Sequence, residues 1–177
     1  KDLKTKTVFS FEPDKLIFAQ LKKSLKKFKN IRFYNFAIAS SENYKELNFY
    51  AIPALNSFNL IKQSLQNTTK FIEKRKIECQ SLDNFVISHN INSIDLLNVD
   101  TNGSELSILE GAKKLLGTGK VKNIEICLLS PNIYNLAVNN LSKILSTLDH
   151  HNFVLDQIFF EPIDFKITKY YFMFSLK

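Results

Sequence analysis

The sequence predicts an α/β fold with one mostly parallel sheet and an antiparallel edge at its C-terminal end. Strand-like runs and helical apolar patterns alternate along the chain. The stretch Ile94–Ala112 has the pattern of a strand, a tight turn and a helix. The chain closes with two strand-like runs, Phe153–Phe160 and Tyr170–Leu176. No helical pattern separates these two runs, so we expect them to pair antiparallel.

The first strand is expected over Thr7–Phe11, where alternate residues are β-branched or aromatic. Pro13 lacks an N–H group and ends that strand. Asp14 can cap a helix over Lys15–Lys27, whose apolar residues have helical spacing. The lysines of this helix occupy its other face, which we interpret as a solvated surface.

Further strands are expected over Ile31–Ala39, Glu46–Ile52 and Arg75–Gln80. The polar stretch Asn56–Thr69 predicts a loop, which either faces a substrate or simply connects two strands at the surface. Ser81 is the expected N-cap of a short helix over Leu82–Ser88.

The central strand is expected over Ile94–Val99 and is followed by a polar turn. Gly103 suits the turn, Ser104 can cap the next helix, and Glu105 would lie in the first turn of that helix. Ligands of open α/β sheets bind beyond the carboxyl ends of strands, so Asp100 and Glu105 are candidate ligand-binding residues. Helix capping is the alternative role for these acidic residues.

After this unit we expect a strand over Val121–Leu129, with the carboxylate of Glu125 inside it, and a helix around Leu141–Leu148. No repeat or change in composition divides the chain. Residues 1–177 are therefore expected to form a single domain.

The composition, 45% hydrophobic and 23% charged, is that of a soluble globular protein. No apolar run approaches the roughly 20 residues that span a bilayer, and no secretory signal is evident, so we expect a cytoplasmic protein without a membrane span. Cys79 and Cys127 are expected to be buried, reduced thiols. The net charge of +7 permits an acidic partner, but the aromatic residues beside the lysines have core spacing, so nucleic-acid binding is not expected.

The sequence shows no pattern typical of a metal site, a nucleophilic catalytic site or a phosphate-binding site. No group of His, Cys, Asp or Glu has the spacing of metal ligands, and neither a nucleophile–histidine pair nor a phosphate-binding loop is evident. Glu12 follows the first strand, where a carboxylate can bind a ribose diol. The glycine-rich turn that usually accompanies such a carboxylate is absent before it. From the residues alone, Glu12 is equally a ribose ligand or a helix-start residue.

Two stretches resemble the FkbM-type S-adenosylmethionine-dependent methyltransferases. Val8–Asp14 (VFSFEPD) is similar to the family segment aFEPdp, and Leu96–Ala112 (LLNVDTNGSELSILEGA) is similar to LLKIDVEGxExxvLxGA. Shorter pieces agree in order, namely Ala37–Ser40, Gln80–Asp83 and Ile124–Ile126. The resemblance covers nearly the whole chain, from the family's second strand onward.

The resemblance implies a Rossmann-like class I methyltransferase sheet that binds the cofactor S-adenosylmethionine. By matching position, it implies that Glu12 binds the ribose hydroxyls and that Ala37, Ile38 and Ser40 lie near the adenine. It also implies that Asp100 contacts the cofactor at the methyl-transfer region. The implied acceptor is a hydroxyl group of a sugar or another small molecule.

A hydroxyl acceptor benefits from a nearby base that takes its proton. The resemblance makes Asp100 the first candidate for that base and Glu105 the second, with Glu125 lining the same cleft. Asn98 and Asn102 replace a Lys and a Glu that are usual in the family. The alternatives are a catalytically inactive, methyltransferase-like binding module and a nicotinamide-dependent Rossmann enzyme, against which the central motif argues.

In this family a first strand and a glycine-rich loop hold the methionine part of the cofactor. The sequence lacks that unit, so the chain is expected to be an N-terminally incomplete domain. The first strand of the family lies between its second and fourth strands. We therefore expect either a gap between Thr7–Phe11 and Ile94–Val99 or direct pairing of these two strands. The sequence assigns no oligomeric state.

Overall fold

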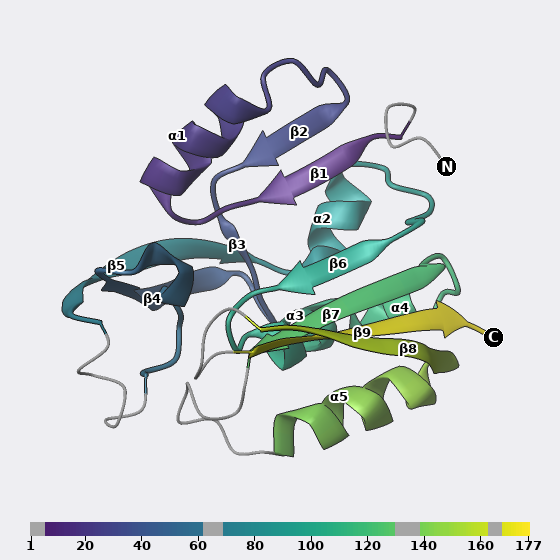
Figure 1. The fold of residues 1–177 in the computed structure, drawn as a ribbon. Coiled ribbons are helices and arrows are strands. Elements are labelled where there is room, and N and C mark those ends of the chain that lie inside the picture. Colours follow the sequence, from purple (N-terminus) through teal and green to yellow (C-terminus); the bar gives the residue numbers. More distant parts are fainter. Residues whose placement is uncertain (1–5, 62–68, 130–138, 163–167) are drawn as a thin grey trace.

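The structure is a computed structural model that describes residues 6–61, 69–129, 139–162 and 168–177. Its described strands form three sheets, which helices flank (Figure 1). Parallel and antiparallel strand pairs are equally frequent among them. The α/β class is as predicted, but the expectation of one mostly parallel sheet is corrected to a mixed arrangement of three sheets.

The first sheet pairs β1 (Val8–Phe11) in parallel with β2 (Ile31–Tyr34). The connecting helix α1 (Lys15–Ser24) has the predicted N-cap, Asp14, but leaves the helical path at Leu25, earlier than the sequence predicts. Residues of α1 are exposed or half-buried throughout. This unit therefore lies on the outside of the molecule.

The second sheet has the order β3 (Ala37–Ile38), β5 (Phe71–Gln80) and β4 (Asn43–Tyr50). The prediction of one strand over Ile31–Ala39 is wrong, because this stretch divides into β2 and β3 in different sheets. The break contains Asn35, whose side-chain amide donates to the backbone carbonyls of Glu12 at 2.9 Å and Pro13 at 3.2 Å. β4 begins earlier than the predicted Glu46 and ends at Tyr50 instead of Ile52, and β5 begins earlier than the predicted Arg75. The two strands pair antiparallel, and a 3-10 turn, η2 (Pro53–Leu55), follows β4.

The third sheet has the order β6 (Leu97–Asp100), β7 (Asn123–Leu129), β9 (Thr168–Leu176) and β8 (Phe153–Pro162). The pair β6–β7 is parallel, whereas β7–β9 and β8–β9 are antiparallel. The predicted antiparallel C-terminal edge is therefore confirmed.

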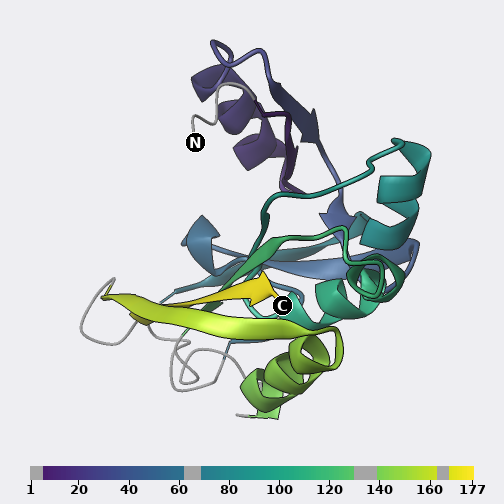
Figure 2. The same ribbon diagram turned by 90° about the vertical axis from the view of Figure 1, so that its right-hand side faces the viewer.

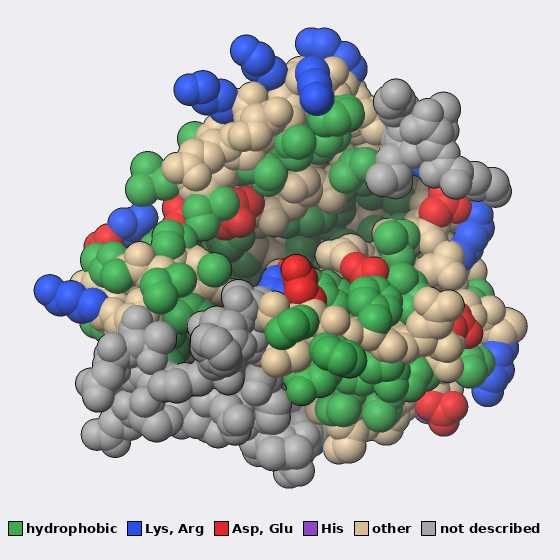
Figure 3. Space-filling model, viewed as in Figure 1, with side chains coloured by type: hydrophobic (Ala, Val, Ile, Leu, Met, Phe, Trp, Pro, Cys, Tyr) green, Lys and Arg blue, Asp and Glu red, His purple; other side chains and the backbone are tan. Residues whose placement is uncertain are grey.

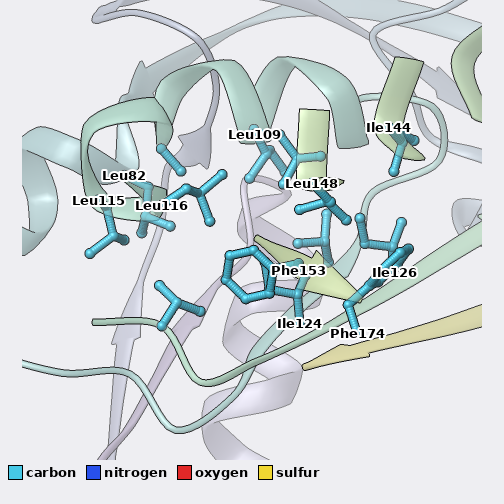
Figure 4. Packing of buried hydrophobic residues seen from close by; sticks show 14 of the residues in the cluster. Leu82, Leu109, Leu115, Leu116, Ile124, Ile126, Ile144, Leu148, Phe153 and Phe174 are labelled. Atoms are coloured by element: carbon cyan, nitrogen blue, oxygen red, sulfur yellow. The ribbon is translucent and has the colours of Figure 1, made fainter. Parts of the chain in front are cut away.

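The remaining helices are α2 (Leu82–Ser88), α3 (Glu105–Gly111), α4 (Lys113–Leu116) and α5 (Asn139–His150). They gather on one side of the third sheet (Figures 1 and 2). The predicted cap Ser81 accepts a hydrogen bond from the backbone N–H of Asn84. The main core lies between these helices and the sheet (Figure 4), and its fully buried side chains include Leu109, Leu116, Ile124, Ile126, Ile144, Leu148 and Phe174.

The strands β1 and β6 run in the same direction in Figure 1 but belong to different sheets. Of the two expected alternatives, the gap is therefore confirmed and direct pairing is wrong. The ammonium of Lys6, before β1, lies 2.7 Å from the carboxylate of Asp95, before β6. Hydrogen bonds from Lys122 and Lys6 lower the pKa of Asp95 to about 2.

Aromatic packing joins the first sheet to the rest of the molecule. The ring of Phe85 in α2, only 1% exposed, meets Phe11 and Tyr34 edge-on at centroid distances of 4.8 and 4.9 Å. Phe9 lies 5.7 Å from the same ring. Such edge-to-face contacts are favourable, so α2 connects the first sheet to the core although β1 and β6 are not paired.

Both cysteines, Cys79 and Cys127, are buried and form no disulfide, as predicted. In the described ranges, no helix combines the length and the apolar character that crossing a bilayer would require.

Candidate functional site

The turn after β1 places Glu12 at the end of the strand, half-buried. Its Oε1 accepts a hydrogen bond from the backbone N–H of Asp14 at 2.8 Å, and Oδ1 of Asp14 accepts one from Leu16 at 2.8 Å. Burial raises the pKa of Glu12, although the N–H of Asp14 opposes this shift. Among the described residues, none donates to Oε2 of Glu12. One carboxylate oxygen therefore stabilises the turn, and the other can accept hydrogen bonds from a ligand.

The turn after β6 contains two consecutive residues with left-handed backbone, Asn102 (φ 53°) and Gly103 (φ 99°). Glycine and asparagine tolerate this conformation best, so the predicted tight turn is confirmed. Glu105 is 2% exposed, and its Oε1 accepts hydrogen bonds from the Gly103 N–H at 2.8 Å and the Thr101 hydroxyl at 3.3 Å. Burial raises the pKa of the Glu105 carboxyl.

Glu105, the first residue of α3, stabilises this turn. The Ser104 side chain forms no cap hydrogen bond, so the prediction that its hydroxyl caps α3 is wrong. The Glu105 carboxylate instead accepts from the N–H of Gly103, which precedes the helix, whereas an N-cap serine would accept from Leu106 or Ser107. This geometry favours a structural role for Glu105 over direct contact with a substrate.

A loop between the two turns joins them through hydrogen bonds. The side-chain amide of Asn56 donates to Oδ2 of Asp14 at 3.3 Å, and the amide of Asn102 donates to the Asn56 carbonyl at 3.1 Å. The Ser57 hydroxyl donates to the Asn102 carbonyl at 2.6 Å, and Asn59 donates to the next carbonyl of that turn at 3.0 Å. The carboxyl ends of β1 and β6 are therefore held at one edge of the molecule.

The sequence predicted Asn56–Thr69 only as a surface or substrate-facing loop, and the bridging of the two turns by residues 56–59 was not predicted. Part of that stretch, residues 62–68, lies outside the described residues. The high asparagine content of residues 56–59 was the available signal, because asparagine amides often bridge backbone groups of neighbouring turns.

Asp100 ends β6, and its Oδ2 lies 2.7 Å from the ammonium of Lys169 in β9. Burial lowers the pKa of Lys169, but the hydrogen bond and the charge of Asp100 outweigh that effect and raise it overall. The neighbouring thiol of Cys127 has a pKa raised to about 12, chiefly by burial and further by Asp100. The thiol is therefore protonated, and Lys169 is the cation that balances the Asp100 carboxylate.

Glu125 lies in β7 directly opposite Asn98 of β6, and the Asn98 side-chain amide donates to its carboxylate. Asp100 is two residues beyond Asn98, so it projects from the same face of the sheet. The structure thus brings Asp100 and Glu125 to one sheet face. Asn98, which stands where the family has Lys, is the partner of Glu125.

Ala37 and Ile38 form β3 and are buried, at 6% and 9% exposure. The backbone N–H of Ser40 donates to the Ser107 hydroxyl of α3 at 3.1 Å. An added Cβ at Gly111 would lie 2.0 Å from the Ala39 carbonyl oxygen, so α3 packs directly on the chain after β3. Of the three predicted adenine-side residues, Ala37 and Ile38 therefore lie in β3, and Ser40 lies beside α3 on the chain segment that leaves β3.

Figure 3 shows a hollow between the β1–β2 unit and β6, with hydrophobic side chains inside it and acidic side chains around it. Phe9, Phe11 and Tyr34 are half-buried on the β1–β2 side of the gap. An apolar hollow with carboxylates at its rim can hold a ring system and bind hydroxyl groups. Within the described ranges, no three His, Cys, Asp or Glu side chains gather in a way that could hold a metal ion.

Residues 1–155 match the sequence model of the methyltransferase FkbM domain. In fold, the chain is similar to a crystal structure of the methyltransferase FkbM from Methylobacillus flagellatus KT, with a TM-score of 0.58 and 14% sequence identity. That match covers 94% of this chain and 36% of the other, so the chain spans about a third of the length of that protein. No curated protein is significantly similar to the chain in sequence.

Proposed function

Since the chain belongs to the FkbM methyltransferase family, we propose that it takes part in methyl transfer from S-adenosylmethionine to a hydroxyl group of a sugar or small metabolite. The observation that carries this proposal is the hydrogen-bonded connection between the turns after β1 and β6. It holds a ribose-binding candidate and a base candidate at one edge. The protein is proposed to act in the cytoplasm, without nucleic acid as a partner.

Glu12 is the proposed ribose-binding residue. A carboxylate beyond the end of a parallel strand can accept hydrogen bonds from both ribose hydroxyls. Oε1 is already engaged by the Asp14 N–H, which fixes the orientation of the carboxylate before a ligand arrives. Ala37, Ile38 and Ser40 are proposed to lie on the adenine side, with Ala37 and Ile38 buried in the two core clusters on either face of β3.

Asp100 is the proposed base. When bound, the cofactor supplies an electrophilic methyl group on its sulfonium. The chain would position the acceptor and take the proton from its hydroxyl at a carboxylate oxygen of Asp100. The ammonium of Lys169 lies 2.7 Å from Oδ2 of that carboxylate and orients it. Glu125 lies on the same sheet face and would accept a hydrogen bond from the acceptor, whereas Glu105 stabilises the turn.

The residues fit the cofactor only in part. The four glycines of the chain are Gly103, Gly111, Gly117 and Gly119, all after β6. A glycine-rich turn before Glu12, which would approach the methionine end of the cofactor, is absent from the sequence. The proposal therefore assigns the ribose and adenine contacts to this chain and no residue of it to the methionine end.

Calorimetric titration with S-adenosylhomocysteine tests the proposal, both on this chain and on the longest chain that its gene encodes. Glu12→Gln keeps an acceptor for the Asp14 N–H but removes the charge that strengthens hydrogen bonds to hydroxyl groups. We expect this variant to weaken binding about tenfold or more. Glu46→Gln changes an exposed carboxylate of β4 and serves as the matched control.

If both the Glu12→Gln and the Glu46→Gln variants bind S-adenosylhomocysteine as tightly as the wild type, the ribose role of Glu12 is refuted. Absence of binding by both chains would favour the second candidate function, an inactive methyltransferase-like binding module. Among the described residues, the facing edges of β1 and β6 are unpaired, and this observation favours that alternative.

A further inference from the structure

The strand β8 lies at the end of the third sheet. Among the described residues it pairs only with β9, so its other edge presents unpaired backbone N–H and C=O groups. A long open edge is a template for pairing with another strand. The pairing register of β8 shifts between Leu155 and Gln157, and the strand continues regularly from Gln157 to Pro162.

The segment Gln157–Pro162, which we call the β8 arm, is exposed at every residue. Ile158 and Phe160 are 58% and 69% exposed on one face, and Phe159 is 42% exposed on the other. Phe159 stacks on Tyr171 of β9 with ring centroids 5.1 Å apart. In Figure 2 the β8–β9 hairpin projects away from the helices, so the helices leave both faces of the arm uncovered.

The β8 arm carries little of the charge that usually protects an edge. Its one ionisable residue is Glu161, whose carboxylate accepts a hydrogen bond from the Tyr171 hydroxyl at 2.9 Å. It contains no lysine, and its one proline, Pro162, stands at its end. Natural edge strands are commonly protected by lysines, prolines within the strand or a short length.

We propose that two copies of this chain associate through their β8 arms, which pair antiparallel about a two-fold axis and join the two third sheets into one. The backbone edge supplies hydrogen bonds, and the exposed apolar side chains of both copies pack across the junction. This inference is independent of the proposed methyl transfer.

The arm is complementary to itself. Residues opposite each other in an antiparallel pair point to the same face, so a two-fold pairing must place one residue opposite its own copy. With Ile158 at the centre, Glu161 faces Leu155; with Phe159 at the centre, it faces Gln157. Neither register places two carboxylates opposite each other, which would be destabilising.

The distribution of charge also favours this edge. The lysines of α1 project from the far side of the molecule, opposite to β8 (Figures 1 and 3). Two chains of net charge +7 that meet through their β8 arms therefore keep these lysines apart. The positive net charge of the chain therefore does not prevent a second copy from pairing with the β8 arm.

Sedimentation velocity over a concentration series tests the proposal. We expect the mass of the wild-type chain to rise from 20.5 kDa towards twice that value. Phe160→Lys places a charge at the junction and should raise the dimer dissociation constant at least tenfold. Ile87→Lys is the matched control, because Ile87 on α2 is also 69% exposed. A monomer at every concentration up to about 1 mM would overturn the proposal.

Disulfide trapping provides a second readout that does not depend on the lysine variant. Ile158→Cys and Phe159→Cys each place a thiol next to its own copy in one of the two registers, while both natural cysteines are buried. We expect one of the two variants to cross-link faster than Ile87→Cys. Equal cross-linking of all three, or association that Phe160→Lys does not weaken, would show that another surface mediates association.

Discussion

The unit formed by β1 and α1 and the unit formed by β6 and α3 share one plan but differ in burial. Each has a four-residue parallel strand, a turn with a carboxylate and a helix. No residue of α1 is buried, whereas α3 buries Glu105, Ile108, Leu109 and Gly111. The residues of β1 are all half-buried, whereas Val99 in β6 is 2% exposed.

This difference separates what a sequence motif determines from what packing determines. Both motifs produce a strand, a turn and a helix, because turns and helix starts depend on neighbouring residues. The two units differ in stability, because burial of apolar surface supplies most of the stabilising free energy. The proposed ribose ligand Glu12 thus lies on a unit that can open locally, and the proposed base Asp100 lies on the core sheet.

The largest expected effect comes from breaking the contact between the two units. Phe85→Ala removes the ring that meets Phe11 and Tyr34, and loss of a buried Phe costs about 3–5 kcal/mol. We expect amides of β1 and β2 to lose protection in hydrogen exchange before those of β6 and β7. Ile87→Ala, at an exposed position of the same helix, should change the free energy of unfolding by less than about 0.5 kcal/mol. Uniform loss of protection would contradict the comparison.

A second test strains the firmly packed unit itself. Gly111→Ala drives a Cβ against the Ala39 carbonyl, 2.0 Å away, and should cost about 3 kcal/mol in urea unfolding. Gly117→Ala is its matched control. An added Cβ there meets its nearest neighbours at 3.5 Å or more, so we expect a change below about 1 kcal/mol. Similar losses in both variants would show that the close approach of α3 is not what makes Gly111 necessary.

The buried carboxylate of the second unit can be tested by pH. Glu105→Ala leaves the Gly103 N–H without its partner and should cost about 1–3 kcal/mol. Burial raises the pKa of Glu105 in the folded state, so its contribution to stability is fully present below the pKa of the unfolded chain and is lost as the pH rises through the folded pKa.

Glu105→Gln does not titrate, so its stability relative to the wild type should increase with rising pH in that window. Urea midpoints between pH 4 and pH 7 measure this difference. Glu110→Gln changes an exposed carboxylate of the same helix and should leave the pH profile unchanged. A constant difference between Glu105→Gln and the wild type would mean that Glu105 is not the titrating group.

The smallest expected effect concerns the exposed helix of the first unit. Asp14→Ala removes the N-cap of α1 and the partner of Asn56, and loss of such a cap costs about 1 kcal/mol. Asp14→Asn keeps an acceptor and should recover most of the loss. Hydrogen exchange should show the change in α1 and not in α3. A global loss above about 2 kcal/mol would indicate that the first unit is more firmly coupled than its burial suggests.

Most local features of the fold were predictable from the sequence, with the cap at Ser104 as an exception, whereas long-range features were not. The caps Asp14 and Ser81 and the turn at Gly103 were predicted because each depends on residues within one turn of the chain. The division of Ile31–Ala39 into two strands was missed, because Asn35 finds its partners at Glu12 and Pro13 in a distant segment.

The site shows the same limit. The sequence identified Asp100 and Glu125, and the structure brings them to one sheet face. The sequence did not indicate Lys169 as the partner of Asp100, because the two residues are 69 positions apart. They meet only because β9 lies between β7 and β8 in the sheet. The sequence left two roles open for Glu105, structural or ligand-binding, and its hydrogen bond from Gly103 and its 2% exposure favour the structural role.

The position of β9 beside β7 also has a consequence for synthesis of the protein. The partners β1 and β2, or β4 and β5, emerge from the ribosome in close succession. By contrast, β7 gains β6 at once but waits for Thr168–Leu176 before its other edge is paired. During that interval the growing chain exposes Ile124 and Ile126, which are fully buried at the end. We expect the nascent protein to be most prone to aggregation, and most dependent on chaperones, between the emergence of these two strands.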